Sequence, residues 1–384
     1  ISNTRIDALQ NFFKKNGFRH WKKKPLTIKE YAINSYPSVS KDDEITSSLS
    51  QLARLINTYQ KEIEIIIVDD GSTDSTAQIC DKFACMDERV RVVHQENRGL
   101  PMARKRGLSL AKGDFIKFVD SDDWCEPNMC EHLFEKAIET KADIVFSSAF
   151  RHREDGIVKI CNLPLADGVY QVRELFDCYI LPLFGDLKED KLITTGYVWC
   201  CLFKRNSIQN IEFYHDINLH EDEIIVIQAL INSRTIYITE EALYHYNRMG
   251  NNTMSKKSCY WEKYWDNIVA VFQAKMKYGK ILFEKELDYM PRLVTMLYLK
   301  YFRSVRNETH YTNPSKFWGG LKNVYRLKNT DYLRRYKKYL IYQELTMIER
   351  LLAKLIQFKI YVIPYFYYAI KCGRMRTFQE KTKN

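Results

Sequence analysis

The chain has 384 residues, a formal net charge of +11, and hydrophobic residues at 46% of its positions. This apolar content supports a sizeable core and argues against a disordered chain. The length suits two domains, or one domain with a large extension. The positive charge favours polyanionic partners such as phosphates, nucleic acid or an anionic membrane surface. No apolar run reaches the ~18 residues of a confident membrane span.

The first part of the chain is predicted to form a leader, a loop and a helix. Residues 1–30 read as a basic helical leader, with the densest charge at His20–Lys24, which fits a solvated leader or a binding patch. A loop is expected around Tyr36-Pro37. Apolar residues at helical spacing then predict a helix over 44–59.

Two short apolar segments end abruptly on acidic residues. Ile63–Val68 stops at Asp69-Asp70, and Phe115–Val119 stops at Asp120–Asp123. Short β-branched or aromatic runs bounded by turn residues are typical of buried strands in an α/β sheet. Carboxylates at the tips of such strands face the crevice where open α/β sheets bind ligands. Two acidic tips therefore suggest one site for a metal and a phosphorylated ligand.

The segments around these strands alternate between strand and helix. Helices are predicted over 72–83, 101–111 and 128–140, and strands over 89–93 and 143–146. Such alternation predicts an α/β fold with a mostly parallel sheet and flanking helices.

The second half of the chain changes character. An apolar strand is expected over 196–203, the acidic run His220–Glu223 precedes an apolar helix over 224–231, and short strands follow at 235–239 and 242–246. After about residue 260 the pattern becomes helical and rich in aromatic residues and lysine. The tail Leu351–Lys371 suits a helix in a membrane interface. A core helix of a C-terminal helical domain is an equal alternative.

Asp120 and Asp122 place two oxygen ligands on one tight turn. Mg²⁺ and Mn²⁺ favour such ligands and usually complete their shells with water and substrate phosphates. A bound divalent ion stabilises the negative charge that develops on a leaving diphosphate. Most acidic loops are merely solvated, but the strand before this one and Trp124 after it strengthen the metal interpretation.

Asp69 and Asp70 end the first strand in the same setting. A carboxylate there can accept hydrogen bonds from a base or ribose, and burial without a donor would be costly. The alternative is a strand-end turn or a helix cap. Between the two tips, Glu96–Arg104 forms a turn into a helix, from which Arg104 could reach a phosphate. A helix N-terminus with surface arginines is the alternative there.

Three ordered blocks resemble family 2 glycosyltransferases of the GT-A fold: Val68–Asp74, Glu96–Gly99 with Ala103-Arg104, and Phe118–Trp124. The resemblance covers residues of about 45–150 well. It implies a transferase domain over 31–255, with a donor half to about 150 and an acceptor half after it, and a helical C-terminal region over 256–384.

The resemblance also implies a chemistry, namely inverting transfer from a nucleotide-activated sugar, often a UDP-sugar, with Mn²⁺ or Mg²⁺. Asp70 matches the carboxylate that contacts the base or ribose. Asp122 matches the principal metal ligand, and Asp120 touches the sugar-ribose side or the metal. The remaining donor-side candidates are Asp69, Asn97, Arg104 and Tyr36.

On the acceptor side, His220–Glu223 resembles the family more loosely. Asp222 matches the general base that deprotonates the acceptor hydroxyl, which contributes ~10²–10⁴-fold. The alternative for Glu221-Asp222 is a helix N-terminus favoured by negative charge.

One departure from the family concerns its first strand, which normally ends in Pro-x-Tyr-Asn and carries an aromatic residue that stacks on the base. Residues 28–43 contain Tyr36-Pro37 but no apolar strand, so we expect this strand to be absent or rewritten. Tyr36 is the candidate for the missing stack. A second departure is Lys105, where the family more often has asparagine.

These observations favour an inverting glycosyltransferase that acts on a glycan or lipid-linked acceptor hydroxyl in bacterial capsule, lipopolysaccharide or exopolysaccharide synthesis. The alternative is a catalytically impaired relative that binds only nucleotide or a partner. Nucleic-acid binding is disfavoured because no motif for it appears. Ten cysteines without a Cys-x-x-Cys pair fit a reducing compartment. We expect a cytoplasmic protein, peripheral on the inner face of the plasma membrane.

Overall fold

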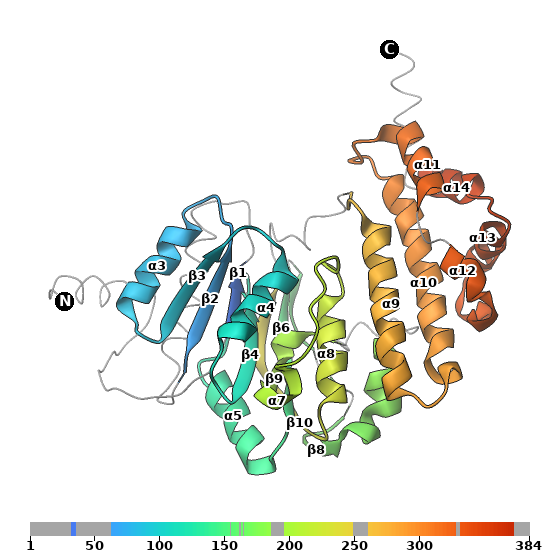
Figure 1. The fold of residues 1–384 in the computed structure, drawn as a ribbon. Helices are drawn as coiled ribbons and strands as arrows, with labels where there is room; N and C mark the ends of the chain where they lie inside the picture. The colour runs from blue at the N-terminus through green and yellow to red at the C-terminus, as the bar shows by residue number, and fades with distance from the viewer. Residues whose placement is uncertain are drawn as a thin grey trace.

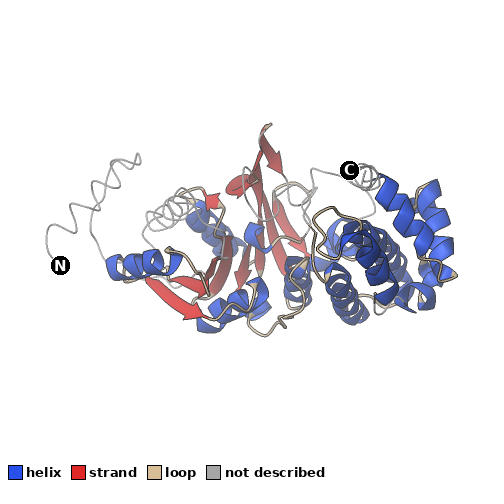
Figure 2. Cartoon of the chain, turned by 90° about the horizontal axis from the view of Figure 1, so that it is seen from above, coloured by secondary structure: helices blue, strands red, loops and turns tan. Residues whose placement is uncertain are grey.

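A computed structural model describes residues 32–35, 63–153, 155–160, 163, 165–185, 196–248, 260–327 and 331–371. Within these residues, one sheet with helices on its faces is followed by a group of helices at the C-terminal end (Figure 1). Viewed from above, the strands occupy the middle of the molecule and the C-terminal helices form one end of it (Figure 2). The basic leader and the helix predicted over 44–59 lie outside the described residues.

The sheet has ten strands, eight of which lie in the order β3-β2-β1-β4-β9-β6-β10-β5. In addition, β7 pairs with β6 and β8 pairs with β10. The strands are β1 (Ala32–Ser35), β2 (Ile65–Asp70), β3 (Val90–Gln95), β4 (Phe115–Asp120), β5 (Trp124–Cys125), β6 (Ile144–Arg153), β7 (Gly156–Ile160), β8 (Gly168–Gln171), β9 (Cys201–Lys204) and β10 (Thr235–Asn247).

The sheet is parallel in its N-terminal half and mixed beyond it. Strands β3, β2, β1 and β4 are parallel to one another. Strand β9 then runs antiparallel to both β4 and β6, and β10 is parallel to β6. The α/β sheet with flanking helices and a helical C-terminal extension is thus confirmed, with the parallel arrangement confined mainly to the first half. Parallel neighbours need a long crossover, which the helices of this half supply.

A first strand is present, so one half of our expectation, that it would be absent, is wrong; its residues, Ala32–Ser35, still depart from the family pattern. Strand β1 lies between β2 and β4 and is parallel to both. The segment is short and lacks the apolar run that marks a buried strand in sequence. Pairing with a strand on either side satisfies the backbone polar groups of β1. This pairing stabilises the strand, although its residue types do not predict one. The sheet therefore has no missing inner strand.

Helices cover the sheet and build the C-terminal region. Helix α4 packs on β1 and β2, and α9 packs on α8, which connects the sheet to the C-terminal helices (Figure 1). The helices are α3 (Thr76–Met86), α4 (Leu100–Leu110), α5 (Met129–Thr140), α6 (Leu181–Leu183), α7 (Arg205–Ile208), α8 (Glu221–Ile231), α9 (Tyr264–Leu282), α10 (Glu286–Glu308), α11 (Lys316–Arg326), α12 (Asp331–Arg335), α13 (Met347–Gln357) and α14 (Val362–Lys371).

Two local predictions change in detail. The strands expected over 235–239 and 242–246 form one long strand, β10, whose register against β6 shifts between Thr239 and Ala242 and again before Tyr244. A bulge of this kind bends a strand without ending it, which is why the sequence pattern predicted two separate strands. The strand expected over 196–203 begins as a 3₁₀ turn at Val198–Cys200 and continues as β9. No described helix is long and apolar enough to cross a membrane.

Candidate active site

The two acidic strand tips lie at the same edge of the sheet. In the register of β1, Ser35 is opposite Asp69 on β2, and Asn34 is opposite Asp120 on β4. Neighbouring strands are about 4.8 Å apart, so the two tips are separated by roughly 10 Å across β1. Residues about fifty positions apart in sequence are therefore brought to one end of the parallel strands, where ligands of such sheets bind.

The Asp69 and Asp70 carboxylates are both buried and hydrogen-bonded. Asp69 accepts from the Ser72 backbone N–H at 3.0 Å, and its other oxygen lies 2.8 Å from His94 Nδ1. Hydrogen bonds to Asp69 and Asp81 raise the pKa of His94. The Asp69 pKa is lowered: burial would raise it, but the bonds from Ser72 and His94 outweigh that effect.

Asp70 holds the loop that enters α4. Its Oδ1 accepts from Gln95 Nε2 at 2.6 Å and from the Arg98 N–H at 2.9 Å, and its Oδ2 accepts from the Gly99 N–H at 2.8 Å. The turn after Asp70 packs closely on the same loop, because a Cβ at Gly71, where φ is +76°, would lie 2.7 Å from the Asn97 backbone nitrogen. Asp70 thus fixes Asn97, whose side chain is exposed, at the edge of the sheet.

Buried hydrogen bonds of Asp123, the third aspartate of the turn after β4, anchor that turn. Asp123 is fully buried, and its carboxylate accepts from the Tyr244 hydroxyl at 2.8 Å and from the Asn247 N–H at 2.8 Å. The Tyr244 hydroxyl in turn accepts from the Asp120 N–H at 3.1 Å. Burial, with Asp122 and Asp120 nearby, raises the pKa of Asp123 well above its usual range. With Asp123 pointing inward, Asp120 is left partly exposed and Asp122 exposed.

Arg104 connects the two halves of the sheet domain. It lies on α4 with a side chain only 1% exposed, and its guanidinium donates to Asp120 Oδ1 at 3.1 Å, to Glu221 Oε1 at 3.0 Å and to Asp222 Oδ1. One arginine therefore joins the tip of β4 to the first turn of α8, and its contact with Asp222 spans 118 positions of sequence. Burial alone would lower the Arg104 pKa, but the three carboxylates raise it above its ordinary value.

The first turn of α8 gathers three acidic residues, Glu221, Asp222 and Glu223, where the helix dipole favours negative charge. Asp222 Oδ2 also accepts from the Val198 N–H at 3.4 Å. Burial raises the Asp222 pKa, and Arg104 opposes that rise. Burial and the neighbouring Asp222 raise the pKa of Glu221 to about 8. The cluster therefore places proton-accepting groups beside the β4 tip in surroundings that favour holding a proton.

Comparison with known proteins bears on this site. The family model described as "Glycosyl transferase family 2" matches residues 43–211. The glycosyltransferase GlyG of Streptococcus pneumoniae is 32% identical over 237 residues, which cover 58% of this chain and 72% of GlyG. The putative glycosyltransferase EpsH of Bacillus subtilis is 29% identical over 277 residues, or 71% of this chain and 76% of EpsH. The chain belongs to glycosyltransferase family 2.

The fold comparison agrees with this family 2 assignment. The crystal structure of S. aureus TarS 1-349 in complex with UDP-GlcNAc superposes with a TM-score of 0.60 at 16% sequence identity, covering 90% of this chain and 92% of that 1-349 chain. At that identity the likeness establishes the fold, which is of the GT-A type that the sequence motifs predicted. Its coverage extends past the sheet domain into the C-terminal helices.

In this family 2 glycosyltransferase, most of the predicted site residues gather at one edge of the sheet. Asp69, Asp70 and Asn97 lie at the β2 side, Asp120 and Asp122 at the β4 side, and Arg104 with Asp222 between β4 and α8. Arg104 reaches carboxylates here, where the sequence suggested a phosphate. Tyr36 lies outside the described residues.

Sequence reasoning missed three residues of the site. Asp123 was assigned no role of its own, although it anchors the turn that carries Asp120 and Asp122. Tyr244 and Glu221 were also missed as partners of Asp123 and Arg104. Only Asp123 offered a signal, because it is the third carboxylate within Asp120–Asp123 and directly follows Asp122. The Tyr244 contact crosses 121 positions and has no local signature.

Replacing Arg104 tests how much the cluster contributes to the free energy of unfolding. Arg104→Met removes the only cation that contacts Asp120, Glu221 and Asp222 among the described residues, so we expect the free energy of unfolding to fall by about 3–5 kcal/mol. Without the guanidinium, the folded-state pKa values of Glu221 and Asp222, which burial already raises, lie further above their unfolded values. Their stabilising contribution is then present at low pH and lost as pH rises, so the deficit should grow between about pH 5 and pH 8.

Urea unfolding of both proteins at the two pH values measures this effect. Arg106→Met is the matched control, because Arg106 is exposed on the same helix and its loss should change stability by less than about 0.5 kcal/mol. If Arg104→Met loses little free energy of unfolding, or if the loss decreases as pH rises, Arg104 does not stabilise the three carboxylates as described.

Proposed function

We propose that this protein is an inverting glycosyltransferase that moves a sugar from a nucleotide-sugar donor, a UDP-sugar, to a hydroxyl of a glycan or lipid-linked acceptor in bacterial surface-polysaccharide synthesis. The observation that carries the proposal is the meeting of three elements at one edge of the sheet: the Asp69-Asp70 tip, the Asp120–Asp123 tip and the Glu221-Asp222 turn. The family assignment supports sugar transfer, and the complex of TarS with UDP-GlcNAc supports a UDP-sugar donor.

The donor-side residues divide by position. Asp69 and Asp70, at the β2 tip with Asn97 beside them, are proposed to face the base and ribose. A carboxylate oxygen has two lone pairs, so Asp70 can keep its loop contacts and still accept from a nucleotide. Tyr36, which follows β1 directly in sequence and lies outside the described residues, remains our candidate for stacking on the base.

The carboxylates at the β4 tip fit a divalent cation that arrives with its substrate. No group of three or more metal-binding side chains occurs within the described ranges. Mg²⁺ and Mn²⁺ need no such cage, because one or two carboxylates with water and phosphate oxygens complete their shells. Asp122, which is exposed, and Asp120 would hold the ion, which when bound stabilises the charge of the leaving diphosphate.

Asp222 is proposed as the general base. It sits on the rigid first turn of α8, and Arg104 fixes its carboxylate relative to Asp120. The acceptor hydroxyl would give its proton to Asp222 as its oxygen attacks the anomeric carbon from the face opposite the diphosphate, which inverts that centre. A base whose pKa is raised toward the working pH accepts a proton more readily. Arg104 acts as a positioning residue in this arrangement.

The metal-site proposal predicts a specific loss in Asp122→Ala. Turnover of a UDP-sugar that depends on Mn²⁺ should fall by at least about a hundredfold, because metal-supported charge stabilisation supplies several kcal/mol. Sugar-nucleotide hydrolysis, with and without Mn²⁺, measures it. Glu139→Gln, at an exposed carboxylate on α5, is the control and should behave as wild type. Undiminished metal-dependent turnover in Asp122→Ala would remove the proposed ligand.

The general-base proposal is tested with Asp222→Asn, which keeps the shape of the side chain. We expect kcat for transfer to fall by ~10²–10⁴-fold while the donor KM changes little, because the lost function is proton transfer. Calorimetry with UDP and Mn²⁺ should show unchanged donor binding. A variant that still transfers sugar at the wild-type rate would exclude Asp222 as the base.

The alternative, a catalytically impaired relative, was suggested by a first strand that is missing or altered. Strand β1 occupies that place, which removes the argument from a missing strand, whereas the altered sequence of the segment still stands. The two remain distinguishable by experiment. Binding of UDP and Mn²⁺ with no turnover of any sugar nucleotide would favour the impaired relative.

We further propose that residues 31–255 act as the transferase domain and that the helical region 256–384 holds the protein on the inner face of the plasma membrane. Helix α13 supports this docking because it has two apolar faces. Leu352, Ala353 and Ile356 are buried against the other helices. On the opposite side, Met347 is 87% and Phe358 is 76% exposed.

The charge beside this outer face selects an anionic lipid surface as its partner. Leu351 lies between Met347 and Phe358 along the helix, and the exposed Lys354 shares their face. Lys359 follows directly and is also exposed. Apolar side chains flanked by lysines are suited to the boundary between acyl chains and acidic headgroups.

The docking proposal predicts that the variant Met347→Ser/Leu351→Ser/Phe358→Ser loses membrane binding. Each lost apolar side chain removes about 1.5–3 kcal/mol of transfer free energy when fully buried, so the bound fraction should fall at least about tenfold. Flotation with phosphatidylglycerol vesicles measures it, and phosphatidylcholine vesicles should bind less. Ile138→Ser, at an exposed residue of α5, is the control. Equal flotation of the triple variant and the wild type would exclude this surface.

A further inference from the structure

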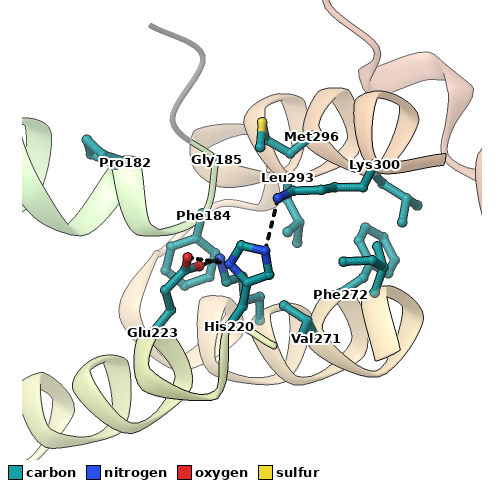
Figure 3. A pocket seen from close by; sticks show the side chains of 13 residues that line it. Pro182, Phe184, Gly185, His220, Glu223, Val271, Phe272, Leu293, Met296 and Lys300 are labelled. Atoms are coloured by element: carbon teal, nitrogen blue, oxygen red, sulfur yellow. Dashed lines mark hydrogen bonds and ion pairs between the residues drawn. The ribbon is translucent and has the colours of Figure 1, made fainter. Parts of the chain in front are cut away.

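A cavity of about 100 Å³ lies behind the helix that carries Asp222, between α8, α9 and α10. Figure 3 shows His220 in its centre, with Glu223 on one side and Lys300 on the other. Successive residues of a helix are rotated by about 100°, so His220 and Glu223 project from the side of α8 opposite Glu221 and Asp222. This rear cavity, as we call it, is thus separate from the proposed active site but shares its helix.

The polar wall of the rear cavity is one connected chain of hydrogen bonds. Lys275 donates to Glu223, whose other oxygen lies 2.7 Å from His220 Nδ1. His220 Nε2 lies 2.9 Å from Lys300 Nζ. A carboxylate only accepts and an ammonium only donates, so the neutral histidine carries its proton on Nδ1 and accepts from Lys300 on Nε2. Each hydrogen bond from Lys275 through Glu223 and His220 to Lys300 therefore has a defined donor and acceptor.

Counted over the described residues, this wall has one more positive than negative side chain. Among those residues, Glu223 is the only carboxylate that lines the cavity, and it pairs with Lys275. Lys300 has His220 as its sole hydrogen-bond partner within the described part of the chain. Burial lowers the Lys300 pKa to about 8; the charge of Glu223 opposes that effect, and Arg303 and Lys275 add to it. No described carboxylate contacts this ammonium, so these surroundings favour an anionic ligand, and two of its three N–H donors remain for one.

The rest of the cavity is apolar. Phe184, Ile268, Val271, Phe272, Leu293, Met296 and Leu297 line it. Figure 3 places Phe272, Val271, Leu293 and Met296 around the ring of His220 and the end of Lys300. A ligand that satisfies both walls needs a charged head and a short apolar body, which inorganic phosphate lacks.

We propose that the rear cavity binds a short aliphatic carboxylate, with its carboxylate on Lys300 and its chain against Met296 and Phe272. A cavity of roughly 150 Å³ accommodates the six carbon atoms of benzene, so one of about 100 Å³ takes about four non-hydrogen atoms, and the rest of a slightly longer ligand lies at its mouth. The carboxylate supplies the counter-ion that Lys300 lacks, and His220 can keep its hydrogen bond. The site is a binding site only and involves no reaction step.

Sodium butyrate is the probe, in a saturation-transfer NMR titration of the full chain. For a ligand of about six non-hydrogen atoms, small-ligand efficiencies give a Kd on the order of 1 mM. Butyramide, which has the same shape without the charge, should bind at least about tenfold more weakly, because it cannot pair with Lys300. Phosphate, which has the charge without the apolar chain, should also bind at least about tenfold more weakly.

Three variants locate the site. Lys300→Met should weaken butyrate binding at least about tenfold by removing the charge, and Met296→Phe should weaken it by filling the cavity while keeping Lys300. Lys280→Met, at an exposed lysine on α9 outside the cavity, should bind as wild type. Circular dichroism checks that each variant folds. The proposal is overturned if butyrate does not bind at ten times the expected Kd, if phosphate binds as tightly, or if both cavity variants bind as wild type.

Discussion

The contact of one buried arginine with three carboxylates is the interaction on which the site depends. Arg104 is placed by α4, Asp120 by the end of β4, and Glu221 and Asp222 by the start of α8. Each carboxylate would be costly to bury alone, and the guanidinium makes their joint burial tolerable. The planar fork of an arginine can serve several acceptors at fixed angles, which a lysine could not. The relative position of the donor-side tip and the proposed base follows from this one side chain.

The same constraint explains the layout around α8. One side of its first turn faces Arg104, and the other side, through His220 and Glu223, faces α9 and α10. His220 adopts a left-handed backbone conformation at the start of the helix, with φ of 65°, which costs free energy and persists because the surrounding contacts fix it. The first turn of α8 is therefore fixed by Arg104 on one side and by contacts with α9 and α10 on the other. This gives the C-terminal helices a physical connection to the residue proposed as the base.

Much of the donor half could be read from the sequence. The strands that end at Asp70 and Asp120, and the helix that begins after Gly99, all appear in the structure within a few residues of their predicted positions. Their signals are local, since a short apolar run followed by turn residues is a property of consecutive positions. Strand β1 was missed because it is held by its neighbours on both sides, and four residues without an apolar run carry no periodicity.

The sequence by itself determined which residues could bear the chemistry: carboxylates at strand ends, an acidic first turn, and an amphipathic tail. The tertiary structure alone decided which of them meet. Asp123 turned inward to Tyr244, and Arg104 turned to Asp222. Lys300 came to face His220 across 80 positions of sequence. The physical reason is that residue type and spacing fix local conformation, whereas the partner of a buried charge depends on how distant elements pack, and no local pattern records that packing.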